Sequence, residues 1–284
     1  MSRVHIKQIS VIVIIAFLSF SNISFAQLII QKSEIEEALS KCTGTESAYS
    51  EAEVLKWCRA AAESGNADAQ FNLGVIYHEG KGVNKDMAEA VRWFQKAARQ
   101  GEQNAQFNLG YSYSKGEGVQ QDLAEAARWY RKAAEQGDTY AQTYLGHMYA
   151  AGNGVNLDSL EAVRWYKTAA EKGNAGAQND LGRLYMTGGR GVPVDYVKAV
   201  YWYQKSANQG NESGQFNIGM MYEYGRGVPQ DYVKAHMWYN ISASQSSNEN
   251  NLAAEFRNSI SHKMTAQQLS ESQQMARDWK PEKY

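Results

Sequence analysis

The chain matches one catalytic motif, at Ser112-Tyr113-Ser114-Lys115. The Ser-x-x-Lys pattern supplies the serine nucleophile and a neighbouring lysine in penicillin-recognising enzymes, which also carry Ser-Asp-Asn and Lys-Thr-Gly elements. Neither of those two elements occurs in this sequence. We therefore interpret the match as chance, and we predict no catalytic residues and a protein that is not an enzyme.

The histidines and glycines do not have the spacing of a metal or phosphate site. No two histidines stand at i and i+4, and none stands at zinc-finger spacing from a cysteine; after the first residues they are His78, His147, His236 and His262. Gly-x-Gly segments such as Gly80-Lys81-Gly82 lead from one expected helix toward another, whereas phosphate-binding loops follow a strand. The sequence therefore predicts no metal and no cofactor.

The two cysteines, Cys42 and Cys58, are close enough in sequence to form a bridge. An even number of cysteines in an exported chain permits a disulfide, and two free buried thiols are the alternative. In the chain-entropy model a loop of this size would stabilise the fold by about 3 kcal/mol. We predict that the bridge holds an atypical N-terminal segment against the next helix.

Six tryptophans recur at nearly constant spacing. The steps between them are 36, 36, 36, 37 and 36 residues, for Trp57, Trp93, Trp129, Trp165, Trp202 and Trp238. A period of this length is typical of stacked-repeat architectures. Gly188-Gly189 explains the longer step, because it adds one residue to a turn. Positions that recur with the period are interpreted as structural, and residues that depart from it are free for a specific function.

Residues 66–101 illustrate one repeat. Apolar residues at helical spacing predict a first helix over 67–79. Asp86 then precedes a second helix, and Glu89 three residues later is placed to complete a capping box. Gly74 lies inside the first helix, where glycine costs about 1 kcal/mol relative to alanine. Its recurrence in each repeat indicates that the partner helix approaches closely at this point.

This repeat resembles the Sel1-like repeat family, whose α/α units are related to the tetratricopeptide repeat. The match covers about residues 50–245 in five full units and one partial unit, and it rests on Ala69-Gln70-Phe71-Asn72-Leu73-Gly74, Tyr77, Gly80-x-Gly82-Val83, Asp86, Ala90, Trp93-Phe94 and Ala97-Ala98. The resemblance implies an all-α fold, a right-handed α/α superhelical solenoid of about six helix pairs plus C-terminal capping helices. It also implies scaffold or adaptor work, often in envelope or host-contact settings.

The first 26 residues have the layout of a secretory signal peptide. A basic start precedes an apolar run of about a dozen residues, and Ser24-Phe25-Ala26 places small residues before Gln27. The alternative is an uncleaved N-terminal anchor. We predict four regions: a signal peptide at 1–26, an N-terminal cap with a partial repeat at 27–65, five repeats at 66–246, and C-terminal capping helices at 247–284.

The charge and hydropathy of the chain also indicate the surroundings in which it works. Removal of residues 1–26 takes away Arg3 and Lys7 and no acidic residue, which changes the formal net charge from −1 to −3. This balance does not favour the basic face that nucleic-acid binding needs. We predict an exported protein that is periplasmic, with onward secretion as the alternative. We also predict that its mature chain binds no nucleic acid and does not insert into a membrane.

By the tetratricopeptide resemblance, one side of each first helix faces a concave groove. We predict that a partner binds there, through Phe71, Val75, His78, Phe107, Tyr111, Tyr140, His147, Arg183, Met186, Phe216, Met220 and Glu223. Several of these positions vary between repeats, and aromatic, Met and Arg side chains are enriched at protein contacts. For Phe71, Phe107 and Phe216 the alternative is packing against an adjacent helix.

The favoured function is a non-enzymatic scaffold of the bacterial envelope that binds a partner polypeptide in the groove. One alternative is β-lactam or peptidoglycan-related binding or hydrolysis, as claimed for cysteine-rich relatives, although this chain lacks their cysteines in each repeat. Another is a structural spacer that assembles through its ends. The partner's identity and the oligomeric state stay open.

Overall fold

The computed structural model describes residues 33–34, 36–42, 49–245 and 251–282, so the predicted signal peptide lies outside the described residues. The chain forms two compact units, which we describe separately. The first contains the described residues up to Ala105 together with Glu117–Val119, and the second contains Gln106–Gly116 and the residues from Gln120 onward. Within the described ranges, no helix is long and apolar enough to cross a membrane.

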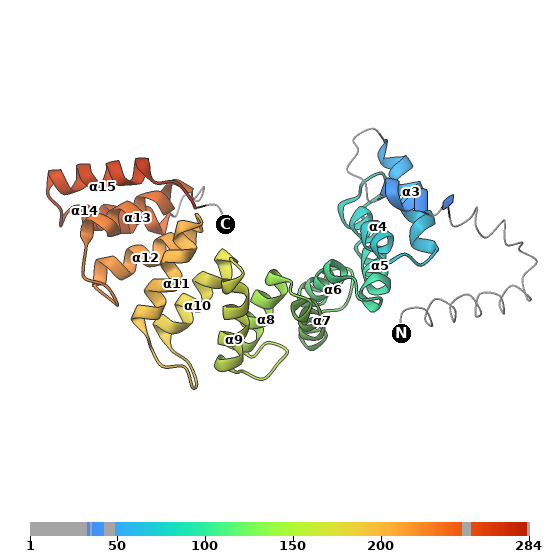
Figure 1. The fold of residues 1–284 in the computed structure, drawn as a ribbon, viewed down its shortest axis with the longest axis horizontal. Coiled ribbons are helices and arrows are strands. Elements are labelled where there is room, and N and C mark those ends of the chain that lie inside the picture. Colours follow the sequence, from blue (N-terminus) through green and yellow to red (C-terminus); the bar gives the residue numbers. More distant parts are fainter. Residues whose placement is uncertain (1–32, 35, 43–48, 246–250, 283–284) are drawn as a thin grey trace, which may run out of the picture. The chain divides into compact units, whose positions relative to one another are not determined.

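Helices follow one another along the chain and are joined by short turns (Figure 1). The first unit holds α3 (Glu51–Glu63), α4 (Ala67–Glu79) and α5 (Met87–Arg99). Most of α6 and all later helices belong to the second unit: α6 (Gln103–Lys115), α7 (Leu123–Glu135), α8 (Thr139–Ala151), α9 (Ser159–Glu171), α10 (Ala175–Thr187), α11 (Tyr196–Asn208), α12 (Glu212–Tyr224), α13 (Tyr232–Gln245), α14 (Leu252–Ser261) and α15 (Ala266–Asp278). The described residues form no strand beyond one isolated bridge, and consecutive helices pack as pairs such as α8–α9 and α10–α11. The predicted all-α solenoid is confirmed.

Aspartate side chains start the second helix of each pair, as predicted. The Asp86 carboxylate accepts a hydrogen bond from the backbone N–H of Glu89 at 2.9 Å. The same bond is made by Asp122, Asp158, Asp195 and Asp231. The Glu89 carboxylate does not complete the predicted capping box, because it pairs with Arg92 at 2.9 Å instead. A complete box forms at Ser50 and Glu53, at the start of α3.

The glycine inside each first helix faces an aromatic ring of the second helix. A Cβ atom on Gly146 would lie 2.6 Å from the ring of Tyr166, and one on Gly182 would lie 2.7 Å from the ring of Tyr203. Real Cβ atoms do not approach this closely, so only glycine lets the two helices pack at this distance. The predicted close approach is therefore confirmed, and it buries the tyrosine rings in the core.

A buried glutamine links neighbouring helices in most repeats. The Gln178 amide donates to the carbonyl of Ala170, one helix earlier, at 3.0 Å. Its own oxygen accepts a hydrogen bond from Gln209, which follows the next helix, at 2.7 Å. The glutamine-to-glutamine bond recurs in other pairs, from Gln100 to Gln70, Gln136 to Gln106 and Gln245 to Gln215. Both polar ends of these buried amides are thus satisfied, as burial requires.

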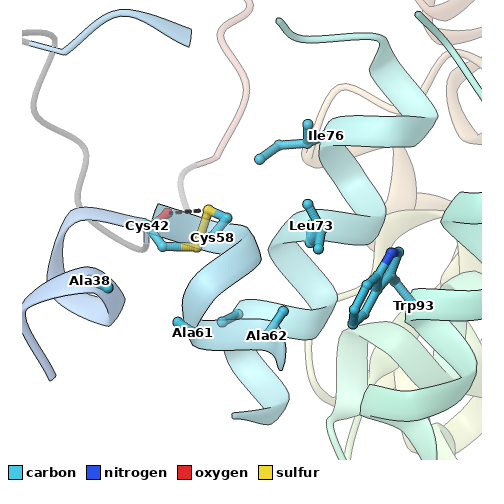
Figure 2. Packing of buried hydrophobic residues seen from close by; sticks show 9 residues of the cluster. Ala38, Cys42, Cys58, Ala61, Ala62, Leu73, Ile76 and Trp93 are labelled. Carbon is cyan, nitrogen blue, oxygen red and sulfur yellow. Dashed lines mark hydrogen bonds between the residues drawn. A yellow bond between two sulfur atoms is a disulfide. The ribbon is translucent and has the colours of Figure 1, made fainter. Parts of the chain in front are cut away.

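The predicted disulfide joins Cys42 and Cys58, with 4.8 Å between their Cα atoms. Figure 2 shows the bridge beside the small residues Ala38 and Ala61, at the end of a core that continues to α4. The Asn72 amide of α4 lies 3.8 Å from the Cys42 sulfur. The bridge therefore fastens the N-terminal segment to α3 at the place where α4 packs.

Helices α14 and α15 both pack against α13 and close the second unit. The buried His236 of α13 is hydrogen-bonded to the buried Ser272 of α15 at 2.9 Å. Trp238 and Trp279 meet edge to face at 5.9 Å. Terminal elements of a repeat array must cover the last apolar face. The predicted C-terminal capping helices are therefore present.

Candidate functional site

The second helices of four pairs each bury a tyrosine whose hydroxyl faces the end of the preceding first helix. The Tyr130 hydroxyl lies 3.4 Å from the Ser114 hydroxyl, the Tyr203 hydroxyl donates to the Met186 sulfur at 3.7 Å, and the Tyr239 hydroxyl donates to the Glu223 carboxylate at 2.8 Å. The positions that face these hydroxyls are Ser114, Ala150, Met186 and Glu223. We call them the hydroxyl-facing row.

This row corrects one of the predicted groove residues, Glu223. Glu223 is 5% exposed, and the Lys263 ammonium lies 3.6 Å from its carboxylate, so it belongs to the interior and not to the groove surface. Met186 is half-buried against Tyr203. Burial, together with the hydrogen bond to the Glu223 carboxylate, raises the pKa of Tyr239 well above its usual range. The residue type at these positions therefore varies with the contact that it makes to the tyrosine hydroxyl of the same repeat, and this variation needs no bound partner to explain it.

One member of the hydroxyl-facing row provides no hydrogen-bond partner for its tyrosine hydroxyl. Ala150 of α8 stands where Ser114 stands in the previous pair, and the Tyr166 hydroxyl is buried with no hydrogen-bond partner among the described residues. Burial, together with the nearby Asp180 carboxylate, raises the pKa of Tyr166 above its usual range, against a smaller opposing effect of Arg183. The hydroxyl therefore stays protonated and is a donor that the fold does not use.

The glutamine link is also broken in the same pair. Lys172 replaces the glutamine that follows α9, and its ammonium donates to the carbonyl of Gly137 at 3.0 Å. The side-chain oxygen of Gln142 is consequently buried without a partner. The described residues contain three further buried side-chain polar atoms of this kind, the indole N–H groups of Trp93, Trp129 and Trp165, which recur with the repeat. Only Gln142 and Tyr166 lose a partner that the other pairs supply.

A hollow of about 690 Å³ lies over this irregular pair, between α8 and the start of α10. Tyr140 projects into solvent at its edge and is 65% exposed. Inside it, the His147 ring nitrogen lies 2.6 Å from the Asp180 carboxylate, which also pairs with Arg183 at 3.4 Å. The imidazole and the guanidinium are both largely exposed, so they are available to a bound group.

Aromatic rings form one wall of this hollow. Tyr144 stacks on Tyr130 with 5.2 Å between ring centroids, and its ring lies 5.8 Å from Phe107 and 6.1 Å from His147. Phe107 also approaches Tyr140 at 6.3 Å. Packed rings of this kind offer a rigid apolar surface that loses little side-chain entropy on binding.

A second hollow of about 420 Å³ lies farther along α10, against α12 and the start of α14. The Asn217 amide donates to the Asn179 side-chain oxygen at 2.8 Å, and Phe216 and Leu252 supply apolar walls. Arg183 lines this hollow, while its ion-pair partner Asp180 lines the first. The two hollows therefore meet along one face of α10 within the second unit.

The other predicted groove residues lie in different surroundings. Phe107 and Phe216 are half-buried, with ring centroids 5.7 Å and 5.5 Å from the tyrosine of the following helix, and Phe71 lies 5.9 Å from Phe94. Packing, the alternative considered for these three, accounts for their positions. The remaining predicted residues are half-buried and line neither hollow: Val75 and His78 in the first unit, and Tyr111 and Met220 in the second.

Sequence reasoning missed Tyr144, Asp180, Asn217 and Lys172. A signal for most of them was present, because Asp180 and Tyr144 interrupt a column of asparagines and Lys172 interrupts a column of glutamines. The three residues stand in columns that build the repeat, and they were not among the predicted site residues. Asn217 follows its column and carried no such signal.

The Ser-x-x-Lys match has no catalytic geometry. Ser112 is buried on α6, and the Lys115 ammonium lies 5.9 Å from the Tyr111 ring. A nucleophile has to reach its substrate, and this serine faces the interior. In the described parts of the chain, no cluster of three or more metal-ligating side chains is found.

Comparison with known proteins identifies the repeat. A family model described as Sel1 repeat matches residues 67–102, 103–138, 139–174, 175–211 and 213–247. The crystal structure of a Sel1 repeat protein from Oxalobacter formigenes is 34% identical with a TM-score of 0.65, covering 80% of this chain and 90% of that one. Among curated proteins, none matches this chain.

Two further solved structures match parts of the chain at lower scores. A protective antigen of uropathogenic Escherichia coli with an SLR fold is 24% identical with a TM-score of 0.42, and the match covers 89% of this chain and 85% of that one. Cysteine-rich protein B of Helicobacter pylori is 25% identical with a TM-score of 0.36, and the match covers 47% of this chain and 97% of that one.

Proposed function

Because this chain belongs to the Sel1 repeat family, we propose that it is a protein-interaction scaffold that binds a segment of a partner polypeptide in the two hollows along α10. Sel1 repeat proteins are generally scaffolds of this kind. More specifically, we propose that the binding site lies on the face of the second unit that α8, α10 and α12 form.

The observation that carries the proposal is that the larger hollow is lined by Lys172 and His147 of the α8–α9 pair, the pair in which Gln142 Oε1 and Tyr166 Oη are buried without partners. Native proteins pair nearly all buried polar groups, and exceptions gather at functional sites. Other pairs of this chain show how the fold would satisfy both atoms, with a glutamine at position 172 and a serine at position 150. The α8–α9 pair lacks both bonds because Lys172 and Ala150 replace these residues, and its exposed His147 and Tyr140 line the hollow.

The chemistry of the hollows fits a polypeptide. The Tyr140 and Tyr144 rings can hold an apolar side chain, and the His147–Asp180–Arg183 group can bind a polar or charged one. Asparagine amides such as Asn179 and Asn217 both donate and accept, which suits the alternating groups of a peptide backbone. Because the walls are preformed, little ordering cost opposes binding.

We further propose that the scaffold works outside the cytoplasm, in the bacterial envelope. The Cys42–Cys58 disulfide supports this location, since such bridges persist in oxidising compartments. The apolar N-terminal sequence with small residues before Gln27 supports it as well. Cleavage after Ala26, measured by mass spectrometry of the exported form, would test this part of the proposal.

The groove is tested by changing Tyr140, His147 and Arg183 together to alanine. All three side chains are exposed, so the fold should be unaffected. Cross-linked complexes from an envelope extract should be lost with this variant. They should survive in a matched control in which the exposed Arg92, Arg128 and Lys167 become alanine. Equal recovery with both variants would contradict the proposed site.

A further inference from the structure

A second surface of the second unit also differs from the repeat pattern. It is an edge formed by the turns before α9 and α11 and by the first residues of those helices. Six side chains lie exposed along it: Leu157, Leu160, Val194, Tyr196, Val197 and Tyr201. Leu160 is 58% exposed and Val197 is 67% exposed, which is unusual for aliphatic side chains on consecutive repeats. None of these residues lines the hollows of the groove.

Large exposed aliphatic side chains are found at these positions only in the α9 and α11 pairs of the described residues, since Val233 at the position of Leu160 and Val197 in the next pair is half-buried. At the position before the capping aspartate, Leu157 and Val194 stand where Lys85 and Gln121 stand in earlier repeats. Two residues after the cap, Leu160 and Val197 stand where the smaller Ala88 and Ala124 stand. Tyr201 likewise replaces the arginines Arg92 and Arg128. The shared frame of the repeat does not need these apolar side chains.

Contacts along the edge make it one continuous surface. A Cβ on Gly191 would lie 3.1 Å from Leu160, so the turn before α11 rests on the start of α9. Gly227 packs in the same way against the backbone of Tyr196, which brings the next turn to the start of α11. The extra residue at Gly188-Gly189 closes a small bridge between Gly189 and Val192, and Arg190 sits at the tip of this turn.

Two arginines without acidic partners flank the apolar side chains. Within the described residues, Arg190 makes no ion pair, and the Arg226 guanidinium lies over the rings of Tyr196 and Tyr224 at 5.7 Å and 5.5 Å. The neighbouring carboxylates are already used, because Asp195 pairs with Lys198 and Glu161 pairs with Arg164. The edge therefore combines exposed apolar side chains with two guanidinium groups, one in the turn between the two apolar groups and one beside Tyr196.

We propose that this arginine-flanked edge is a second docking surface, and that its partner is a polypeptide segment with apolar side chains between acidic ones. Apolar burial would supply the affinity, and the two guanidinium groups would select carboxylates on either side. Tyr and Arg are the side chains most often found at the energetic centre of protein interfaces.

A lipid surface fits the edge less well. The capping carboxylates Asp158 and Asp195 stand among the exposed apolar residues, at the start of α9 and α11. Insertion into a bilayer would strip water from these carboxylates, which is costly for a charged group. A polypeptide can cover the leucine and valine side chains and leave the carboxylates hydrated at the rim.

The test uses short random peptides displayed on phage and selected on the full-length protein. Selected peptides should carry at least two apolar residues with Asp or Glu on both sides. Their affinity should fall about tenfold in Leu160→Gln/Val197→Gln and in Arg190→Glu/Arg226→Glu. It should be kept in the matched control Ala88→Gln/Ala124→Gln and in Arg190→Lys/Arg226→Lys. An unchanged melting temperature shows that each variant is folded.

Three results would overturn the proposal. The first is that no recovered peptide depends on the edge residues. The second is that edge-dependent peptides lack acidic side chains. The third is that the edge variants lose flotation with phosphatidylglycerol vesicles while peptide binding is unchanged, which would assign the edge to a lipid surface. The variant with His147→Ala and Arg183→Ala should keep peptide binding at the edge, which separates this surface from the groove.

Discussion

At the scale of single residues, Lys172 is the substitution with the clearest energetic effect. It removes the donor that a glutamine provides to the buried amide oxygen in other pairs, and Gln142 is left unpaired. A buried acceptor without a partner costs about 1–3 kcal/mol relative to a paired one. The α8–α9 pair therefore carries a local cost that the rest of the second unit avoids.

We predict that Lys172→Gln raises the free energy of unfolding by about 1 kcal/mol, because the new amide can donate to Gln142. Urea denaturation followed by tryptophan fluorescence measures the change. The control is Lys167→Gln on α9, whose ammonium makes only an exposed pair with Glu171 at 3.6 Å and should matter little. A Lys172→Gln variant no more stable than this control would contradict the argument.

His236 predicts a loss of stability in mild acid. Burial, together with the positive charge of Arg257, lowers the pKa of His236 below its usual value. Below about pH 6.5 the folded protein therefore binds fewer protons than the unfolded chain. The contribution of His236 to the free energy of unfolding is fully present above that pH and declines as the pH falls. The slope for one group is at most about 1.4 kcal/mol per pH unit.

Hydrogen exchange of α15 at pH 7.5 and pH 5.5 measures this effect, because Ser272 of that helix is bonded to His236. We expect weaker protection at the lower pH and a smaller pH dependence in His236→Gln. The matched control is the exposed His262→Gln, which should leave the pH dependence unchanged. An α15 whose protection is independent of pH would exclude His236 as the cause.

At the scale of helices, the packing of each pair depends on the glycine under the aromatic ring. We predict that Gly146→Ala destabilises the protein by about 2 kcal/mol, since its Cβ would stand 2.6 Å from the Tyr166 ring. Gly176→Ala on α10 is the matched control, because its Cβ would meet only the Asn174 side-chain oxygen at 3.3 Å. Thermal unfolding should give a large decrease for the first variant and little change for the second.

The helices were predictable because several independent signals agree on them. Period, capping aspartate and Leu-Gly pair all indicated the same boundaries, and the first helix expected over 67–79 is α4. The capping box at Glu89 was not predictable, since Arg92 competes for the same carboxylate. A sequence pattern shows which bonds a side chain can make, whereas the choice between partners depends on three-dimensional distances.

The candidate site was less predictable for a related reason. Variation along a repeat column was taken as a sign of a partner, yet in the hydroxyl-facing row it reflects contacts with the tyrosine of the same pair. Glu223 was assigned wrongly on this basis. Tyr140, His147 and Arg183 do line the hollows. The sequence could locate departures from the repeat, but it could not show whether each one faces inward or outward.

At the scale of the whole molecule, the disulfide should stabilise only the unit that contains it. Replacement of Cys42 and Cys58 by serine is predicted to lower the stability of the first unit by about 3 kcal/mol, because the unfolded chain gains freedom. Amide exchange should speed up in α3 and α4, where the bridge packs, and should be unchanged in α10 to α13. Equal loss of protection throughout the chain would show instead that both units unfold together.

The interrupted glutamine link also has a mechanical consequence. In a linear array each repeat is held mainly by its neighbours, so resistance to stretching is set by the weakest joint. The pair α8–α9 lacks the amide bond that the pairs on either side of it, α6–α7 and α10–α11, possess. Under tension in an optical trap, the second unit should therefore begin to rupture at the α8–α9 repeat, and a partner bound across that repeat would raise the rupture force.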